Sequence, residues 1–253
     1  MHFLDSSLDD NVVLVLLNQT WVSPEDGDSA CYSRFKRLWD NAVFKAAVDG
    51  GTNILHAVNK NLANGGKTLI PDLISGDFDS IDVSLLDFYQ SQGVEVVRTP
   101  DQNFTDFTKC IRIIAEKYDS DQIPASVTDI VCLLGQAERF DHTMANINTL
   151  YEANSLLPSS VRVTLLLKDS SVCLLRPGLT TIEKPCNGAT RCGLFAVGNP
   201  ADVSTNGFKV DLRSASLNFH SLMRNWFEFD QEMATVSTDS ELVLVLPLCG
   251  NDT

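Results

Sequence analysis

Residues 94–118 read VEVVRTPDQNFTDFTKCIRIIAEKY, and this stretch contains one complete strand–loop–helix unit. Val94–Val97 is apolar and rich in β-branched residues, which predicts a buried strand, and Pro100 then ends that strand. Either Asn103 or Thr105 can cap the helix that follows. The helix shows apolar residues every three or four positions, at Phe104, Phe107, Ile111, Ile114 and Tyr118. This spacing predicts an amphipathic helix with one buried face.

The same alternation of strand and helix extends on both sides of this unit. We expect further strands at Val12–Leu17, Thr68–Ile74 and Asp129–Leu134. We expect further helices over residues 35–47, 84–92 and 140–151, where apolar residues return at helical spacing. Strands that alternate with helices predict a mostly parallel sheet with helices on both faces.

From about residue 155 the sequence changes to short β-type runs separated by turn signals such as Asn206-Gly207. The runs are Val161–Lys168, Val172–Leu175, Leu194–Val197, Phe208–Leu212, Ala234–Ser237 and Leu242–Leu246. We therefore predict an α/β plus all-β protein. An N-terminal α/β domain at residues 1–157 is followed by a C-terminal β-sandwich domain at residues 158–253.

The amino-acid composition indicates which partners and which cellular location to expect. The 253 residues include 33 acidic and 19 basic side chains, and the formal charge of −14 argues against a nucleic-acid partner. Seven cysteines, without a CxxC motif, predict reduced thiols in a cytoplasmic protein. The apolar run Val12–Leu17 is too short to span a membrane, so we expect no membrane partner.

Gly76-Asp77-Phe78-Asp79-Ser80-Ile81 follows the expected strand at residues 68–74. Two carboxylates two residues apart project to the same side of an extended backbone, where a divalent cation relieves their repulsion. Asp77 and Asp79 are therefore candidate Mg²⁺ ligands. The alternative is an acidic turn that caps the next helix. A phosphoaspartyl enzyme is disfavoured, because Ile81 stands where that class has threonine.

Two further motifs also follow expected strands. The helix that begins near Thr105 would place Asp106 and its free N–H groups at the mouth of a site, where anions bind favourably. Lys109, one turn later, can meet a phosphate oxygen. Arg139 offers a planar donor group for phosphate, and Asp141 adds a carboxylate. The alternatives are a capped helix with a surface lysine, and a surface Arg–Asp pair.

Asp49-Gly50-Gly51-Thr52-Asn53 is a loop whose paired glycines would let a ligand approach the backbone closely. The alternative is a helix C-cap at Gly50. His56, His142 and His220 show no ligand spacing, so we assign histidine no catalytic role.

Taken together, these motifs give the chain a clear resemblance to the thiamine pyrophosphokinase family. The matching segments, in order, are D-G-G-x-N at Asp49–Asn53, G-D-F-D-S-I at Gly76–Ile81, P-D-Q-x-x-T-D-F-T-K-C at Pro100–Cys110, and R-F-D with a later N-T-L between Arg139 and Leu150. The resemblance implies transfer of a diphosphoryl group from ATP to the hydroxyl of thiamine, which releases AMP. It also implies a homodimer whose active sites lie between subunits.

The resemblance assigns roles to individual residues. The implied catalytic residues are Asp77, Asp79, Asp106 and Asp141, of which Asp77, Asp79 and Asp106 would hold Mg²⁺. The implied ATP-binding residues are Asp49, Asn53, Thr105, Lys109 and Arg139. Gln102 would lie near the thiamine. An aspartate would accept the alcohol proton, and Asp106 is the leading candidate.

Two departures from the family pattern leave the acceptor open. The glycine-rich segment before Arg139 here carries Glu138, and the Ser-Thr-Ser-Asn thiamine motif is replaced by Ser221-Leu222-Met223-Arg224-Asn225-Trp226. Ser221 and Asn225 are candidates to replace the missing contacts. Trp226 can stack on a planar cation or simply pack in the β domain. The alternatives to a thiamine pyrophosphokinase are therefore a nucleotide- or thiamine-binding protein with weakened catalysis, and a diphosphokinase for another alcohol.

Overall fold

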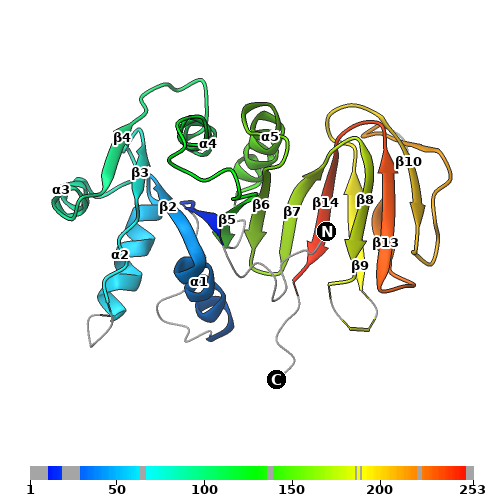
Figure 1. Cartoon of the computed structure of the whole chain (residues 1–253), viewed down its shortest axis with the longest axis horizontal. Helices are drawn as coiled ribbons and strands as arrows, with labels where there is room; N and C mark the ends of the chain where they lie inside the picture. Colours follow the sequence, from blue (N-terminus) through cyan, green and yellow to red (C-terminus); the bar gives the residue numbers. More distant parts are fainter. Residues whose placement is uncertain are drawn as a thin grey trace. The chain divides into compact units, whose positions relative to one another are not determined.

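The computed structural model describes residues 11–18, 29–62, 67–135, 139–185, 187–188, 190–220 and 224–248. These residues fall into two compact units, one ending at Lys168 and the other beginning at Asp169 (Figure 1). The predicted domain boundary at residues 157/158 lies before this division. The expected strand at Val161–Lys168 belongs to the first unit, because it pairs with a strand of that unit.

The first unit alternates strand and helix throughout. Its elements are β1 (Val12–Leu16), α1 (Ser29–Asn41), β2 (Ala42–Val48), α2 (Gly51–Leu62), β3 (Leu73–Gly76), α3 (Val83–Ser91), β4 (Glu95–Arg98), α4 (Asp106–Asp119), β5 (Asp129–Gly135), α5 (Phe140–Leu156) and β6 (Arg162–Leu167). The strands lie in the order β6-β5-β1-β2-β3-β4, and each pairing is parallel. The prediction of a mostly parallel α/β sheet is confirmed.

The order of the strands shows where a ligand site is expected. From β1 the chain moves outward through β2, β3 and β4, and it then returns to the other side of β1 for β5 and β6. Right-handed crossovers place α1, α2 and α3 on one face and α4 and α5 on the other. Figure 1 shows α4 and α5 side by side, and the two helices pack together. Ligands of open α/β sheets bind at the carboxyl ends of the strands near such a reversal.

The prediction of a helix over residues 35–47 is wrong for its second half. The helix α1 ends at Asn41, and Ala42–Val48 forms the strand β2 between β1 and β3. A strand in the middle of a parallel sheet is covered on both faces, so its sequence does not alternate. Ala42, Ala46 and Ala47 thus mimic helical spacing by coincidence. The strand β3 also begins later than predicted, at Leu73.

The second unit is built only from strands. They are β7 (Ser170–Leu175), β8 (Gly178–Glu183), β9 (Arg191–Phe195), β10 (Ala201–Asn206), β11 (Ala215–Leu217), β12 (Arg224–Glu228), β13 (Met233–Thr238) and β14 (Leu242–Pro247). Antiparallel pairing gives two sheets, in the orders β12-β9-β14-β7 and β11-β10-β13-β8. Buried residues from both sheets, such as Leu194 and Val236, form one core. The predicted β-sandwich is confirmed.

The strand predicted at Phe208–Leu212 is a turn instead. The carboxylate of Asp211 accepts hydrogen bonds from the backbone N–H groups of Gly207 and Phe208, at 3.3 Å and 3.2 Å. It also accepts one from Thr205 Oγ1, at 3.0 Å. Such side-chain bonds to nearby backbone compete with strand pairing.

The state of the cysteines and the length of the helices complete the description of the fold. Cys110, Cys132 and Cys173 are buried thiols that take part in no disulfide bond. Among the described residues, the helices are all too short or too polar to cross a membrane.

Candidate active site

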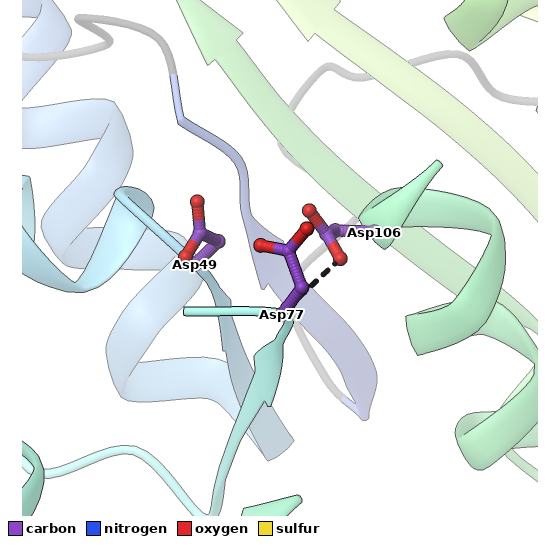
Figure 2. A group of neighbouring side chains, drawn as sticks. All are labelled: Asp49, Asp77 and Asp106. Carbon is purple, nitrogen blue, oxygen red and sulfur yellow. Dashed lines mark hydrogen bonds between the residues drawn. The ribbon is translucent and has the colours of Figure 1, made fainter. Parts of the chain in front are cut away.

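Three aspartates from separate segments of the α/β unit converge at the carboxyl edge of its sheet (Figure 2). Asp49 follows β2, Asp77 follows β3, and Asp106 begins α4. One carboxylate oxygen of each lies within 4.8 Å of the others. Because the strands are parallel, their carboxyl ends meet at one edge, and this brings together residues far apart in the sequence.

Asp49 is the most deeply buried of the three carboxylates, with a relative exposure of 4%. Its backbone φ is 44°, and its N–H donates to Ser75 O at 2.8 Å. Gly76 lies so close that a Cβ there would come within 2.9 Å of the Cβ of Asp49. Burial raises the pKa of Asp49, and its Oδ1 has no hydrogen-bond partner among the described residues. A buried oxygen without a partner is costly unless a ligand pairs with it.

The other two carboxylates are oriented by hydrogen bonds. Asp77 Oδ2 accepts from Gln102 Nε2 at 2.7 Å, and this bond is the main reason why the pKa of Asp77 is lowered. Asp106 Oδ1 accepts from the N–H of Asp77 at 3.2 Å, and Lys109 Nζ lies 2.7 Å from the same oxygen. The bond between Asp77 and Asp106 is the dashed line in Figure 2.

The cluster fits a hard divalent cation. Its donors are all carboxylate oxygens, which Mg²⁺ prefers, and one of the three aspartates, Asp49, has a buried oxygen without a hydrogen-bond partner among the described residues. Three negative groups this close repel one another unless a cation lies between them. The residues that would hold such an ion are Asp49, Asp77 and Asp106.

Asp79, a predicted metal ligand, does not join this cluster. The prediction assumed an extended backbone between Asp77 and Asp79. Instead, Phe78 has a φ of 68°, in the left-handed region, so the two carboxylates do not project to one side. Asp79 accepts a hydrogen bond from Ser80 Oγ at 2.8 Å and lines the adjoining pocket. Its role as a ligand stays a prediction.

A pocket of about 450 Å³ adjoins the carboxylates. Its lining comes from the ends of β1 and β2, from the loop after β3, and from the starts of α4 and α5. The lining residues are Leu17, Asn18, Val48, Asp49, Asp79, Ser80, Thr105, Asp106, Phe107, Arg139, His142, Ala145 and Asn146. Its volume lies within the range of small-molecule sites.

The structure brings Thr105 and Arg139 to this pocket. Thr105 caps α4, because its side chain accepts a hydrogen bond from the N–H of Thr108 at 3.1 Å. Arg139 is exposed and forms an ion pair with Asp141 that raises the pKa of the arginine and lowers that of the aspartate. Asp141 lies outside the carboxylate cluster, so its catalytic role stays a prediction.

Lys109 and Asn53 form hydrogen bonds with other residues of the protein. Lys109 is 7% exposed, and its Nζ donates to Thr99 O at 2.6 Å and Asp101 O at 3.0 Å, besides its ion pair with Asp106. These three contacts use all three donors of an ammonium group. The amide of Asn53 donates to Ser80 O at 2.7 Å and accepts from the N–H of Asp82 at 3.0 Å.

Both side chains therefore support the acidic loops in this structure. Lys109 has no further donor for a phosphate, whereas the amide of Asn53 keeps a second N–H. The direct contact of Lys109 and Asn53 with ATP stays a prediction.

The predicted thiamine-binding residues are divided between the two units. Gln102 lies in the α/β unit, beside Asp77. Ser221 lies outside the described residues, and of Asn225 only the backbone, in β12, is described. Trp226 is exposed, and the guanidinium carbon of Arg191 lies 4.7 Å from the centre of its ring.

Sequence reasoning did not assign four polar residues of the pocket to the site, namely Asn18, Ser80, His142 and Asn146. A signal for two of them was present. His142 and Asn146 are four residues apart on α5, directly after the R-F-D motif, so they share the helix face that meets the carboxyl edge.

Comparison with known proteins agrees with this architecture. The model of the catalytic domain of thiamin pyrophosphokinase matches residues 35–164, and the model of its vitamin B1 binding domain matches residues 180–243. Thiamine pyrophosphokinase 1 of Oryza sativa subsp. japonica is 30% identical over 246 residues, covering 89% of this chain and 90% of the relative.

Two further matches extend the comparison to sequence and structure. Thiamine pyrophosphokinase 2 of Oryza sativa subsp. japonica is 34% identical, covering 84% of this chain and 80% of the relative. The solved structure of thiamin pyrophosphokinase from Candida albicans has the same fold, with a TM-score of 0.77, 23% identity, and coverage of 96% of this chain and 90% of that chain. The chain belongs to the thiamine pyrophosphokinase family.

Proposed function

We propose that this protein transfers a diphosphoryl group from ATP to the hydroxyl of thiamine, giving thiamine diphosphate and AMP. The observation that carries the proposal is the cluster of Asp49, Asp77 and Asp106 beside the pocket, within the residues that match the catalytic-domain model. The match of a vitamin B1 binding domain to residues 180–243 supports thiamine as the acceptor.

The three clustered carboxylates would hold Mg²⁺, and the bound ion would neutralise negative charge on the triphosphate. Arg139 at the rim of the pocket would bind a phosphate oxygen through its guanidinium group. Phosphoryl transfer needs mainly positioning and charge stabilisation from the protein, and a carboxylate cluster next to a basic rim supplies both.

Asp106 is our candidate for the residue that accepts the alcohol proton. Its Oδ1 is held by Lys109 and by the N–H of Asp77, which fixes the plane of the carboxylate. Asp106 also lines the pocket and contributes an oxygen to the carboxylate cluster. A carboxylate held in this way can accept a proton without changing its orientation.

The β unit would bind the thiamine. Trp226 presents an exposed aromatic ring, and Ser221 and Asn225 remain candidates for polar contacts. Gln102 of the α/β unit is a further candidate for contact with thiamine. The proposal includes the homodimer with active sites between subunits, which sedimentation equilibrium would test. It also includes a cytoplasmic location, supported by the buried thiols of the described cysteines.

The direct test is the reaction itself. Purified protein with ATP, Mg²⁺ and thiamine should form AMP and thiamine diphosphate in equal amounts. Asp77→Asn and Asp106→Asn should each abolish the reaction, whereas the exposed Asp87→Asn on α3 should leave it unchanged. Release of ADP in place of AMP would refute the diphosphoryl transfer.

One observation favours a second candidate, a diphosphokinase that acts on another alcohol. The guanidinium of Arg191 already lies over the ring of Trp226, so a planar cation such as thiamine would meet a like charge there. A panel of thiamine analogues with neutral rings would decide between the two acceptors. A protein that binds ATP or thiamine saturably and forms no AMP with any alcohol would instead be a binding protein of this fold.

A further inference from the structure

The side chain of Asn146 on α5 is buried in the wall of the pocket without a hydrogen-bond partner. Its relative exposure is 8%, and its amide makes no hydrogen bond to any described residue. The neighbouring polar residues of the helix are paired. Asn148 donates to Glu152 Oε1 at 2.7 Å, and Thr149 donates to Ala145 O at 3.1 Å.

An unpaired amide in such a place is a poor choice for packing. The amide of asparagine offers two N–H donors and one oxygen acceptor, and burying them without partners destabilises the fold. An apolar side chain of the same size would avoid this cost. Asp49 also lines this pocket, and its buried Oδ1 has no hydrogen-bond partner among the described residues. The amide of Asn146 can therefore pair with a ligand group that enters the same pocket.

The surroundings of Asn146 favour a flat, partly apolar ligand group. Leu17, Val48, Phe107 and Ala145 line the same pocket and supply apolar walls. Asparagine amides pair with adenine in two bonds, in which the amide oxygen accepts from the exocyclic amino group and the amide nitrogen donates to the adjacent ring nitrogen.

We propose that Asn146 binds the adenine base of the nucleotide donor through this pair of hydrogen bonds. The apolar walls would hold the faces of the ring, and the phosphates would extend toward the carboxylates that line the same pocket. This inference rests on the proposed function, in that it takes the ligand of the pocket to be ATP. We choose the nucleotide because the pocket lies within the residues of the catalytic-domain match.

The test compares three ligands by calorimetry in the presence of Mg²⁺ and without thiamine. The ligands are ATP, purine riboside triphosphate, which lacks the amino group, and inorganic tripolyphosphate, which lacks the base. Asn146→Leu should weaken ATP binding at least roughly tenfold, as expected for the loss of paired buried hydrogen bonds. It should weaken purine riboside triphosphate binding less and leave tripolyphosphate binding unchanged.

Asn148→Ala is the matched control, because Asn148 lies on the same helix and is exposed. It should bind all three ligands like the wild type. Thermal unfolding would check that each variant folds, and Asn146→Ala replaces Asn146→Leu if the leucine variant does not. In the wild type, the preference for ATP over purine riboside triphosphate should be clear, and either variant at Asn146 should lose it.

Two results would overturn the proposal. An equal loss of affinity for ATP and tripolyphosphate would assign Asn146 to the phosphates or to the fold. Weaker binding of thiamine with unchanged binding of ATP would show that the amide pairs with the aminopyrimidine ring, which carries the same arrangement of an amino group beside a ring nitrogen.

The proposal and the proposed function fail separately. If ATP binding depends on Asn146 while no thiamine diphosphate forms, the inference stands and the function is refuted. If thiamine diphosphate forms and Asn146→Leu leaves the KM for ATP unchanged, the function stands and the inference is refuted.

Discussion

Replacing Asp49 with asparagine should stabilise the metal-free protein while it removes the response to Mg²⁺. Asp49 is the most buried carboxylate of the cluster, and its Oδ1 has no hydrogen-bond partner among the described residues. Its charge therefore costs folding free energy unless a cation is bound. Asparagine has nearly the same shape and no charge, so the substitution removes this cost together with a metal ligand.

The expected size of the effect follows from the geometry. At the 4.8 Å limit that spans the three oxygens, two like charges repel each other by about 3 kcal/mol at an effective dielectric constant of 20. Asp77 and Asp106 are partly exposed, and solvent screens their charges, so we expect a net gain of about 1–2 kcal/mol. For a chain of this size the gain corresponds to a rise in Tm of roughly 2–8 °C.

The assay is thermal unfolding followed by circular dichroism, with EDTA or with saturating Mg²⁺. In EDTA, Asp49→Asn should unfold at a higher temperature than the wild type. With Mg²⁺ at about 100 times its Kd, the wild type should gain about 2.7 kcal/mol, and the variant should gain little of this. Asp87→Asn, on the exposed side of α3, is the matched control and should follow the wild type in both conditions.

The pH dependence gives an independent check on the sign. Burial raises the pKa of Asp49, so its ionisation destabilises the folded state, and the penalty develops as the pH rises through that raised pKa. The advantage of Asp49→Asn in EDTA should therefore be present at neutral pH and shrink as the pH falls toward 3.8, the ordinary value. A variant that is less stable than the wild type in EDTA and still responds fully to Mg²⁺ would refute the reasoning.

Two further substitutions test the supports of the cluster. Lys109→Met leaves the carbonyl oxygens of Thr99 and Asp101 without their buried donor. The variant should lower the free energy of unfolding, measured in urea, by roughly 2–4 kcal/mol. Unchanged stability together with weaker ATP binding would instead show that Lys109 binds a phosphate. Gln102→Leu removes the hydrogen bond that lowers the pKa of Asp77, so the acid limb of the pH profile of AMP formation should move to higher pH. Because a lowered pKa contributes stability that is lost as the pH falls through it, this variant should also lose stability at a higher pH than the wild type; an unmoved acid limb contradicts the assignment.

The strand–loop–helix unit at residues 94–118 shows which structural features the local sequence can predict. The apolar spacing predicted α4, and the loop offered two caps, of which the structure uses Thr105. The strand β2 escaped prediction because strands buried on both faces do not alternate. In the β unit, β8 and β10 carry several polar residues on their outer faces, so their short runs gave no clear apolar signal.

The metal cluster was predicted in part for a similar reason. The resemblance assigns Asp77 and Asp106 to Mg²⁺ and Asp49 to ATP. The structure brings the carboxylate of Asp49 to the other two, because β2 and β3 are neighbouring parallel strands. Asp79 was included because the left-handed φ of Phe78 cannot be inferred from a residue that normally avoids that region.

The motifs contain two kinds of polar residue that the sequence does not separate. Thr108 and Thr149 come from different motifs, and their hydroxyl oxygens lie 2.8 Å apart, which ties the start of α4 to α5. Like Lys109, they are buried and fully engaged with the protein, and they fix the helix ends that carry the ligand-facing groups. Asp49 Oδ1 is also buried, but it has no hydrogen-bond partner among the described residues, and the amide of Asn146 lines the pocket. Because supporting and ligand-facing residues share the same chemistry and the same loops, only the pairing of each buried polar atom shows which of them await a ligand.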